Sequence, residues 1–495
     1  MKDWFTNLWS RIKGKDKWSE KFEEGCRLFQ TGIFPESETN FQEALTLIEK
    51  SKKADPRLFS TLVCLGACYR AQEKYMQAET ALRQAIDHRN NEKNGHSGDT
   101  AFAYKELASC LYESGHSEKV EEPIRKALEL YEQTSEKGKE EVGECLLILS
   151  RTLITRCRFS EAEPLLERCL GIFDNQNEEK IFELADTLTC QAIVWNRRAE
   201  FQQAEANLRK VMPLHEKLSG QESMEVARCK TELAASLLAQ VRYEEAEQSF
   251  KESMRIMKKL GAQQTIDFAD ALAGLATCLR SQRKFDAAIS FYLQALGIYE
   301  EFHEKDHDDL ATVLTQLAVC HSEQDQFNEA EKYFARAVQV TERLLGSEHG
   351  AVSDTLFNLA NCYSFQKKYE QAVPLYTRAI DISEKFAGIE HPDFASKLTG
   401  LAYCYQLQER FGDAKPLYTR ALEICEKDPQ MPEDELADNL IGLANCHLET
   451  GDYVAAKPLY ERALHFKQNK FDPRDQELAT RIEVLLKRME HSVAK

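Results

Sequence analysis

Residues 359–373 read LANCYSFQKKYEQAV, and this stretch decides the fold. Its first half extends an apolar stripe with the i, i+3, i+4, i+7 spacing of an α-helix, formed by Leu356, Leu359, Ala360 and Tyr363. The polar residues QKK follow, and a second helical stripe begins after them, formed by Ala372, Tyr376 and Ala379. The stretch therefore predicts two α-helices joined by a tight polar turn.

The same unit recurs along the chain with a step of 42 residues and without insertion or deletion. One column of the repeat holds small residues: Ala78, Val120, Ala162, Ala204, Ala246, Ala288, Ala330, Ala372, Ala414 and Ala456. The column three positions earlier holds mostly aromatic residues: Tyr75, Ser117, Phe159, Phe201, Tyr243, Phe285, Phe327, Tyr369, Phe411 and Tyr453. Small residues that face large ones let two helices pack closely, so we expect ten helical hairpins that stack on one another.

The pattern of leucine, alanine and tyrosine in residues 356–379 resembles the tetratricopeptide repeat (TPR). The 42-residue length and the A-x-P-L-Y-x-R-A-L stretches that start at Ala414 and Ala456 are similar to the long-repeat subclass found in kinesin light chains and many bacterial proteins. The resemblance implies an all-α fold, namely a right-handed superhelix (α-solenoid) of antiparallel helix pairs. It also implies a concave groove lined by the first helix of each pair.

The repeat divides the chain into four parts. We expect a basic amphipathic N-terminal segment at 1–18, a divergent helical hairpin at 19–55, ten repeats at 56–469 and a capping helix at 470–495. The N-terminal segment has apolar residues at helical spacing, namely Trp4, Phe5, Leu8, Trp9 and Ile12. Such a segment can pack on the first hairpin, touch a partner or touch a membrane surface, and the last possibility would make the protein a membrane-peripheral adaptor.

The charge balance bears on the choice of partner. The chain has 82 acidic and 64 basic residues, for a net charge of -18, and so it repels phosphate backbones at long range. Nucleic acid is therefore not an expected partner. The chain has no apolar run long enough to span a bilayer, and its 15 cysteines include no CxxC pair. Its first residues have no uninterrupted apolar segment with a cleavage site, so we expect no secretory signal. We expect reduced thiols and a cytoplasmic location.

Residues 303–307 read HEKDH and match the H-E-x-x-H motif of zinc hydrolases. That chemistry needs both histidines on one face of a continuous helix, whereas the repeat places His307 in a connection between two hairpins. We therefore expect no metal, no cofactor and no catalytic residue, so that the chain is not an enzyme. A zinc-dependent hydrolase remains the alternative that a metal analysis would test.

The candidate binding residues lie on the first helices, opposite the apolar stripe. In the repeat at 356–379 they are Asn358, Asn361 and Phe365, and the equivalent positions elsewhere add Thr277, Gly400, Tyr403, Gly442 and Asn445, with Arg280 at the edge. Asparagine can donate to and accept from a peptide backbone. Changing Asn358, Asn361 and Asn445 to Ala is thus expected to weaken partner binding at a nearly constant melting temperature.

Two further columns remain open to interpretation. Glycine in mid-helix at 274, 400 and 442 suggests that either a ligand backbone or a crowded neighbouring helix needs the space. Seven cysteines keep the 42-residue step: Cys68, Cys110, Cys278, Cys320, Cys362, Cys404 and Cys446. They are too far apart for disulfides, and we interpret them as compact packing residues. The sequence thus favours an interaction scaffold that binds a protein or peptide, with the partner and the oligomeric state left open.

Overall fold

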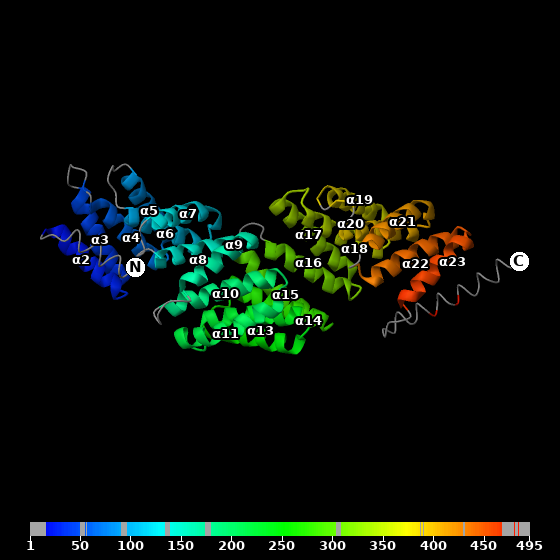
Figure 1. The fold of residues 1–495 in the computed structure, drawn as a ribbon, viewed down its shortest axis with the longest axis horizontal. Helices are drawn as coiled ribbons and strands as arrows, with labels where there is room; N and C mark the ends of the chain where they lie inside the picture. Colours follow the sequence, from blue (N-terminus) through cyan, green and yellow to red (C-terminus); the bar gives the residue numbers. More distant parts are fainter. Residues whose placement is uncertain are drawn as a thin grey trace. The chain divides into compact units, whose positions relative to one another are not determined.

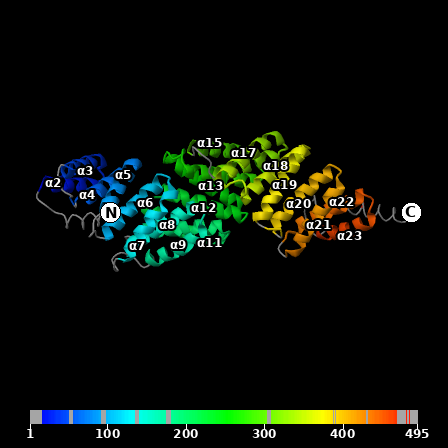
Figure 2. The same ribbon diagram turned by 90° about the horizontal axis from the view of Figure 1, so that it is seen from above.

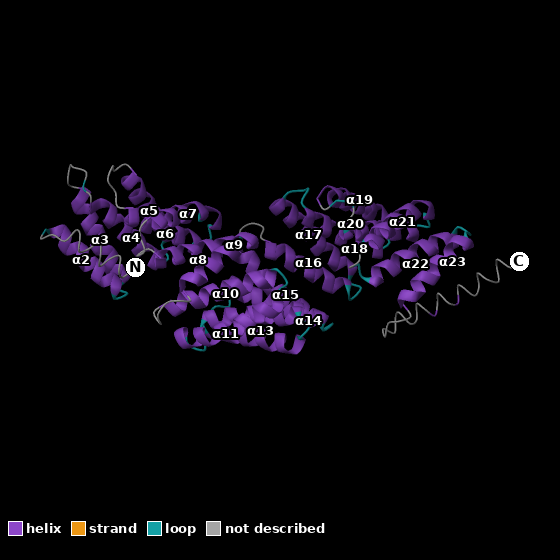
Figure 3. Cartoon of the chain, in the orientation of Figure 1, coloured by secondary structure: helices purple, strands orange, loops and turns teal. Residues whose placement is uncertain are grey.

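The computed structural model contains α-helices and short turns, and the part of the chain that it describes has no strand (Figure 3). It describes residues 16–467 together with Thr480 and Val484, apart from the connecting positions 50–54, 56, 91–96, 134–138, 174–179, 303–307, 387, 390 and 429–430. The chain divides into two compact units, residues 1–242 and 243–495. Within each unit, consecutive helices lie side by side (Figures 1 and 2).

Unit 1 consists of helical hairpins with one short 3-10 turn, η1, at Ser117–Lys119. Its helices are α2 (Lys17–Gln30), α3 (Phe34–Glu49), α4 (Arg57–Ala71), α5 (Tyr75–Asn90), α6 (Ser97–Glu113), α7 (Glu121–Gln133), α8 (Lys139–Thr155), α9 (Phe159–Phe173), α10 (Ile181–Arg197), α11 (Phe201–Ser219) and α12 (Met224–Ala239). The 3-10 turn lies in the copy whose aromatic residue is replaced by Ser117, so the break in the sequence pattern coincides with a break in the helix.

Unit 2 repeats the same hairpins. Its helices are α13 (Tyr243–Lys259), α14 (Ile266–Ser281), α15 (Phe285–Phe302), α16 (Asp308–Ser322), α17 (Phe327–Leu345), α18 (Gly350–Phe365), α19 (Tyr369–Phe386), α20 (Pro392–Leu407), α21 (Phe411–Lys427), α22 (Glu433–Glu449) and α23 (Tyr453–Lys467). From α4 onward we call the even-numbered helices A helices and the odd-numbered ones B helices. Nine of these B helices begin at the aromatic column, as the repeat predicts.

The turn between the two helices of a hairpin has the same backbone geometry in each copy. Its central residue has a positive φ, and these residues again keep the 42-residue step: Glu73, Gly115, Cys157, Ala199, Val241, Arg283, Asp325, Lys367, Glu409 and Gly451. The left-handed conformation lets the amide of the next residue donate a hydrogen bond to a carbonyl near the end of the A helix, as Lys368 N does to Tyr363 O at 2.9 Å. Most copies accept the left-handed conformation without glycine.

Alanine and aromatic side chains form the interior of each hairpin. Ala360 and Ala372 are fully buried, and the Tyr376 ring beside them is 1% exposed. Burial of one such ring contributes about 2 to 3 kcal/mol, and repetition along the chain supplies a continuous core. The interlocking columns seen in the sequence thus correspond to real contacts.

Four thiols of the cysteine ladder join their repeat to the one before it. The thiols donate to the backbone carbonyl of the first residue of the preceding repeat's second helix, in the pairs Cys68–Phe34 (3.2 Å), Cys110–Tyr75 (3.5 Å), Cys278–Tyr243 (3.3 Å) and Cys362–Phe327 (3.4 Å). All fifteen cysteines are free. Burial raises the pKa of Cys110 to about 11, so this thiol keeps its proton and remains a donor at neutral pH. Cysteine is thus a weak hydrogen-bond donor here as well as a small packing residue.

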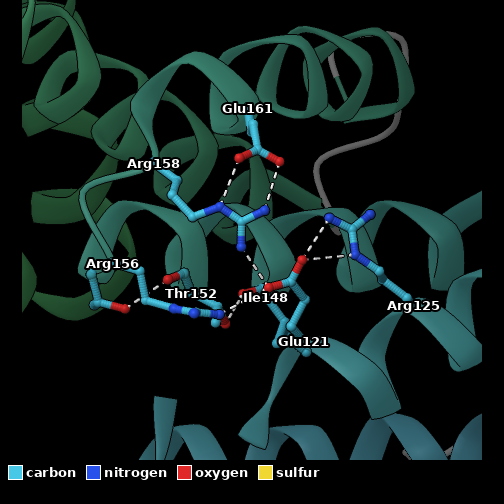
Figure 4. Close-up of polar contacts among 8 residues, drawn as sticks. Glu121, Arg125, Ile148, Thr152, Arg156, Arg158 and Glu161 are labelled. Carbon is cyan, nitrogen blue, oxygen red and sulfur yellow. Dashed lines mark hydrogen bonds and ion pairs between the residues drawn. The ribbon is translucent and has the colours of Figure 1, made fainter. Parts of the chain in front are cut away.

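Ion pairs add a second joint between repeats on the surface of unit 1 (Figure 4). Glu121, at the start of α7, accepts from Arg125 of its own helix at 2.8 Å and from Arg156 at 2.9 Å. Arg158 donates to Glu121 at 2.6 Å and also pairs with Glu161 at 2.7 Å. The hairpin turn after α8 is thereby tied to the B helix of the preceding repeat.

Candidate partner-binding face

The side of each A helix that carries the positions of Asn358, Asn361 and Phe365 is here called the inner face. In unit 2 the A helices adjoin one another, α18 against α20 and α20 against α22, so their inner faces form one continuous surface. Its central part has few charges: Asn361 on α18, Tyr403 on α20 and Asn445 on α22 occupy the same repeat position. The repeat therefore places three of the sequence-predicted residues beside one another.

An exposed apolar patch lies on this surface. Phe365 is 57% exposed, Tyr403 43% and Leu407 40%, and all three lie near the ends of the adjacent helices α18 and α20. The Phe365 ring stacks on Phe327 with a centroid distance of 5.6 Å, which fixes its orientation at the surface. We call Phe365, Tyr403 and Leu407 the apolar patch. Exposed aromatic residues with fixed positions are typical anchors for a protein partner.

Asn361, Asn445 and Thr277 have a structural role that sequence reasoning missed. The buried Tyr376 hydroxyl donates to Asn361 Oδ1 at 2.6 Å, Tyr460 donates to Asn445, and Thr277 Oγ1 lies 2.8 Å from the Tyr292 hydroxyl. Burial raises the pKa of Tyr292 and of Tyr460 to about 12, so both remain neutral donors. Changing Asn361 and Asn445 to Ala would leave buried hydroxyls without these acceptors, so we expect these variants to lower the melting temperature as well.

The sequence contains a signal for this role. In the repeat whose B helix has Phe334 in place of tyrosine, the matching A-helix residue is Val319 and not a polar residue. Where Tyr403 occupies the A-helix position, the hydroxyl of Tyr418 turns to Gln406 Oε1 at 3.0 Å instead. Within unit 2 a polar side chain thus accompanies each tyrosine hydroxyl, and Gln406 joins the inner face as a residue that sequence reasoning missed.

The mid-helix glycines are explained by neighbouring rings. A Cβ at Gly442 would lie 2.4 Å from Tyr418, and one at Gly274 would lie 2.4 Å from Phe250, and both rings come from the B helix of the preceding repeat. A Cβ at Gly400 would lie 2.6 Å from Phe357 of the preceding A helix and 2.9 Å from Tyr376 of the preceding B helix. Of the two explanations that the sequence left open, crowding by a neighbouring helix is therefore the one that the structure supports, and Gly400 and Gly442 leave no space there for a ligand.

Arg280 and Asn358 complete the set of sequence-predicted residues, and both are half-buried. The Arg280 Nε is buried and has no hydrogen-bond partner among the described residues, and its guanidinium lies near the Tyr292 hydroxyl. An arginine without a carboxylate partner can bind the carboxylate of a ligand, because the planar guanidinium donates two hydrogen bonds to such a group.

In unit 1, ion pairs connect consecutive A helices from α4 to α10, whereas in unit 2 such a pair joins α18 to α20, between Asp354 and Lys397 at 2.8 Å. Arg70 of α4 contacts Glu106 of α6 at 3.2 Å, and Lys105 of α6 contacts Glu144 of α8 at 2.5 Å. Arg151 of α8 pairs with Asp186 of α10. Burial by itself would raise the pKa of Glu144, but the nearby positive charges, with Lys105 and Lys180 among them, together hold this pKa below its usual value.

Among the described residues, no group of three or more His, Cys, Asp or Glu side chains could hold a metal ion. The HEKDH motif at 303–307 falls between α15 and α16, outside the described residues. Residues 1–15 and most of the expected capping helix also lie outside the described residues. No helix that the structure describes is both long and apolar enough to cross a membrane.

Stacked helical hairpins with a shared inner face define a class of protein, the α-solenoids. The family model described as "Tetratricopeptide repeat" matches residues 57–133, 183–259, 267–338, 316–385 and 393–469. The chain therefore belongs to the tetratricopeptide repeat family, as the sequence pattern predicted. This family consists of protein–protein interaction scaffolds, and the repeats indicate that general role here.

Solved structures of this fold give further matches. BtubC (BKLC) from P. vanneervenii is 22% identical over 47% of this chain and 94% of its own, with a TM-score of 0.42. A Podosopora anserina protein with nearly identical TPR-like repeats, provisionally named a kinesin light chain, is 21% identical over 42% of this chain and 99% of its own, with a TM-score of 0.39. The Cut9–Hcn1 hetero-tetramer of APC/C is 13% identical over 96% and 97%, with a TM-score of 0.41. No curated protein matches the chain.

Proposed function

We propose that this protein is a non-enzymatic scaffold that binds a partner through an extended peptide segment on the inner face of unit 2. The apolar patch carries the proposal, because Phe365, Tyr403 and Leu407 expose large apolar side chains side by side on adjacent helices. An apolar side chain of the peptide would pack between them. Burial of such anchors supplies most of the binding free energy in protein interfaces.

Polar groups on either side of the patch would align the peptide backbone. The amide nitrogen of Asn361 makes no hydrogen bond with the described residues, while its oxygen is held by Tyr376. A side chain fixed in this way can donate to a peptide carbonyl at little entropic cost. Asn445 has the same arrangement with Tyr460, and Arg280 would receive an acidic residue of the peptide.

The cysteines support a location in the cytoplasm. Fifteen free thiols, nearly all of them buried, suit a reducing compartment, where disulfides do not form. The oligomeric state and the identity of the partner do not enter the proposal.

A pair of substitutions in the full-length chain tests the binding face. Changing Phe365 and Leu407 to Ser should weaken capture of the partner from extracts of the native cell by at least about 30-fold, because two anchors are lost. The matched control changes Leu293 and Val454 to Ser, which are 44% and 78% exposed on the B helices α15 and α23. Mass spectrometry would compare the captured proteins. If both variants captured the partner equally well, the apolar patch would not be the binding site.

A further inference from the structure

An ion pair connects consecutive B helices in several copies of the repeat. A glutamate near the end of one B helix pairs with an arginine that follows 36 residues later, on the next B helix. The pairs are Glu132–Arg168, Glu300–Arg336 at 2.5 Å, Glu342–Arg378 at 2.6 Å and Glu426–Arg462 at 2.5 Å. We call this contact the B-helix ion pair. It keeps the 42-residue step and bridges neighbouring copies at the surface.

Both members of this pair are replaced between α13 and α15. The glutamate position holds Lys258 and the arginine position holds Gln294, and these two side chains cannot form an ion pair. Lys258 is the one basic residue at its position among the ten copies. Its ammonium lies 5.8 Å from the centroid of the Phe268 ring, and Gln294 Nε2 donates to Ser290 O of its own helix at 3.2 Å. Neither side chain therefore bridges the two B helices.

A groove lies at this same junction. It has a volume of about 550 Å³, and its apolar lining comes from three consecutive helices of unit 2, with Met254 on α13, Leu275 on α14 and Phe291 on α15. Phe291 is half-buried, and the other two side chains form the floor. Pockets that bind small ligands measure about 300 to 1,000 Å³. We call this site the outer groove, and it is large enough to receive a side chain of a partner.

One wall of the outer groove is basic. Lys251, Arg255, Lys258 and Lys259 of α13 line it, and no acidic residue is found in the lining that the structure describes. Lys251 pairs with Glu247 at 2.5 Å, and Glu247 lines a neighbouring hollow of mixed charge further toward the start of α13. The positive charge of the groove is therefore concentrated at the last three of these residues, near the end of the helix.

The helix macrodipole explains only part of this charge. A basic residue in the last turn is favourable in any helix, and other copies have one at the position of Lys259, namely Lys217, Arg343, Lys385 and Lys427. The macrodipole acts equally at Lys258, yet α15, α17, α19 and α21 all have glutamate there. No other copy has Lys or Arg at the position of Arg255. Lys258 and Arg255 thus need a reason specific to this groove.

We propose that the outer groove binds an extended acidic peptide segment of a partner protein, with one apolar side chain of the peptide on Leu275 and Phe291. Alternate residues of an extended peptide recur every 6.6 Å or so, close to the rise of one helical turn between the cations of α13. Arg255 can bind a carboxylate through two hydrogen bonds. The apolar floor favours a peptide over a polyphosphate, which has no apolar group to bury. This site lies on other helices than the inner-face site and does not depend on it.

Restoring the B-helix ion pair tests the proposal. The probe is a fluorescein-labelled heptapeptide with leucine at its centre and Glu or Asp elsewhere, titrated with the full-length chain by fluorescence anisotropy. Lys258→Glu combined with Gln294→Arg should weaken binding at least about tenfold, because it removes a cation and bridges the groove. The melting temperature should not fall, since an ion pair is gained. The control Lys332→Gln, exposed on α17, makes the same change in net charge and should leave the affinity unaltered.

Two further measurements locate the peptide. A heptapeptide with serine in place of leucine should bind at least about fivefold more weakly, because the floor then buries no apolar group. Phe365→Ser combined with Leu407→Ser should not change the affinity, since both residues belong to the inner face. Loss of binding in that variant would place the peptide on the inner face and overturn the proposal. So would unchanged binding after Lys258→Glu with Gln294→Arg.

The class of ligand is tested with heparin as a polyanion without apolar side chains. Heparin should compete with the heptapeptide only weakly. If heparin binds the native chain through Lys258 while the heptapeptide shows no binding at about 1 mM, the groove is a general polyanion site and the proposal is wrong. Absence of binding by both probes would equally overturn it, and neither result would bear on the apolar patch.

Discussion

The inner faces of the two units use the same backbone for different surfaces. In unit 1, charged side chains pair between neighbouring A helices, as in Lys105–Glu144 and Arg70–Glu106. In unit 2, buried tyrosines donate to polar side chains of the A helices, one ion pair (Lys397–Asp354) joins α20 to α18, and the inner face exposes Phe365 and other uncharged side chains. The contrast shows that the hairpin packing needs only one side of each A helix. The other side is free to become either a structural joint or a binding surface.

Removal of the Lys105–Glu144 ion pair in unit 1 should have the largest effect on the unfolding free energy. Glu144→Ala leaves the buried Lys105 ammonium without its closest acceptor, and we expect unit 1 to lose about 3 kcal/mol of unfolding free energy. Urea denaturation followed by circular dichroism would measure the shift in midpoint. Glu348→Ala is the control in unit 2, because its pair with Lys385 is exposed, and it should hardly move the midpoint. Similar midpoint shifts for both variants would contradict the stronger stabilisation that we expect from the buried ion pair of unit 1.

The same pair predicts a dependence on pH. The folded-state pKa of Glu144 lies below its usual value of 4.5. Its contribution to stability is therefore fully present above pH 4.5 and is lost as the pH falls through the lowered folded-state pKa. Denaturation curves of the native chain and of Glu144→Ala should thus converge in acid. A constant gap between them would show that Glu144 acts through packing alone.

The glycines of unit 2 should give the next largest effect. Gly442→Ala forces a Cβ within 2.4 Å of the Tyr418 ring, and we expect a net loss of about 2 kcal/mol. Gly297→Ala is the control, since no atom lies within 4 Å of the new Cβ in the middle of α15, and it should stabilise the chain by up to about 1 kcal/mol. Thermal denaturation distinguishes the two signs. A stable Gly442→Ala chain with reduced partner binding would restore the ligand explanation for this glycine.

The tyrosine joint of unit 2 is weaker than the charged joint of unit 1. Tyr376→Phe removes the donor to Asn361 and should cost about 1 kcal/mol. The pair Tyr376→Phe with Asn361→Val reproduces the natural combination of Phe334 and Val319 and should recover most of that loss. A double-mutant cycle on the unfolding free energies measures the coupling. Additive losses would contradict the proposed link between the two columns.

The smallest expected effect is common to both units. Val241 in unit 1 has a φ of 65°, a left-handed conformation that a β-branched residue adopts at a cost, whereas Gly451 occupies the equivalent turn in unit 2. Val241→Gly should stabilise unit 1 by about 0.5 to 1 kcal/mol, and Gly451→Ala should destabilise unit 2 by a similar amount. Differential scanning calorimetry would record both shifts. If both substitutions changed the stability in the same direction, the two turns would not have the same preference for glycine.

The repeat made the helices predictable, because one 42-residue period aligns aromatic, alanine and turn positions in all copies except the one with Ser117 and Val120. The contacts between repeats were harder to predict. Spacing places Asn361 on a helix face, but only the structure shows that the hydroxyl of Tyr376, 15 residues later, donates a hydrogen bond to the Asn361 side-chain oxygen. Phe357 likewise meets Tyr376 edge to face, and Lys397 crosses to Asp354 at 2.8 Å. Such contacts depend on side-chain direction between helices, which a periodic pattern does not encode.

The cysteine ladder also bears on how such a chain can change length. Its donor lies on the A helix of one copy, and its acceptor is the backbone carbonyl that opens the second helix of the copy before. Because any residue supplies that carbonyl, duplication or deletion of one 42-residue segment would recreate a complete junction at the new boundary. The array can therefore gain or lose whole copies in evolution without inventing a new contact.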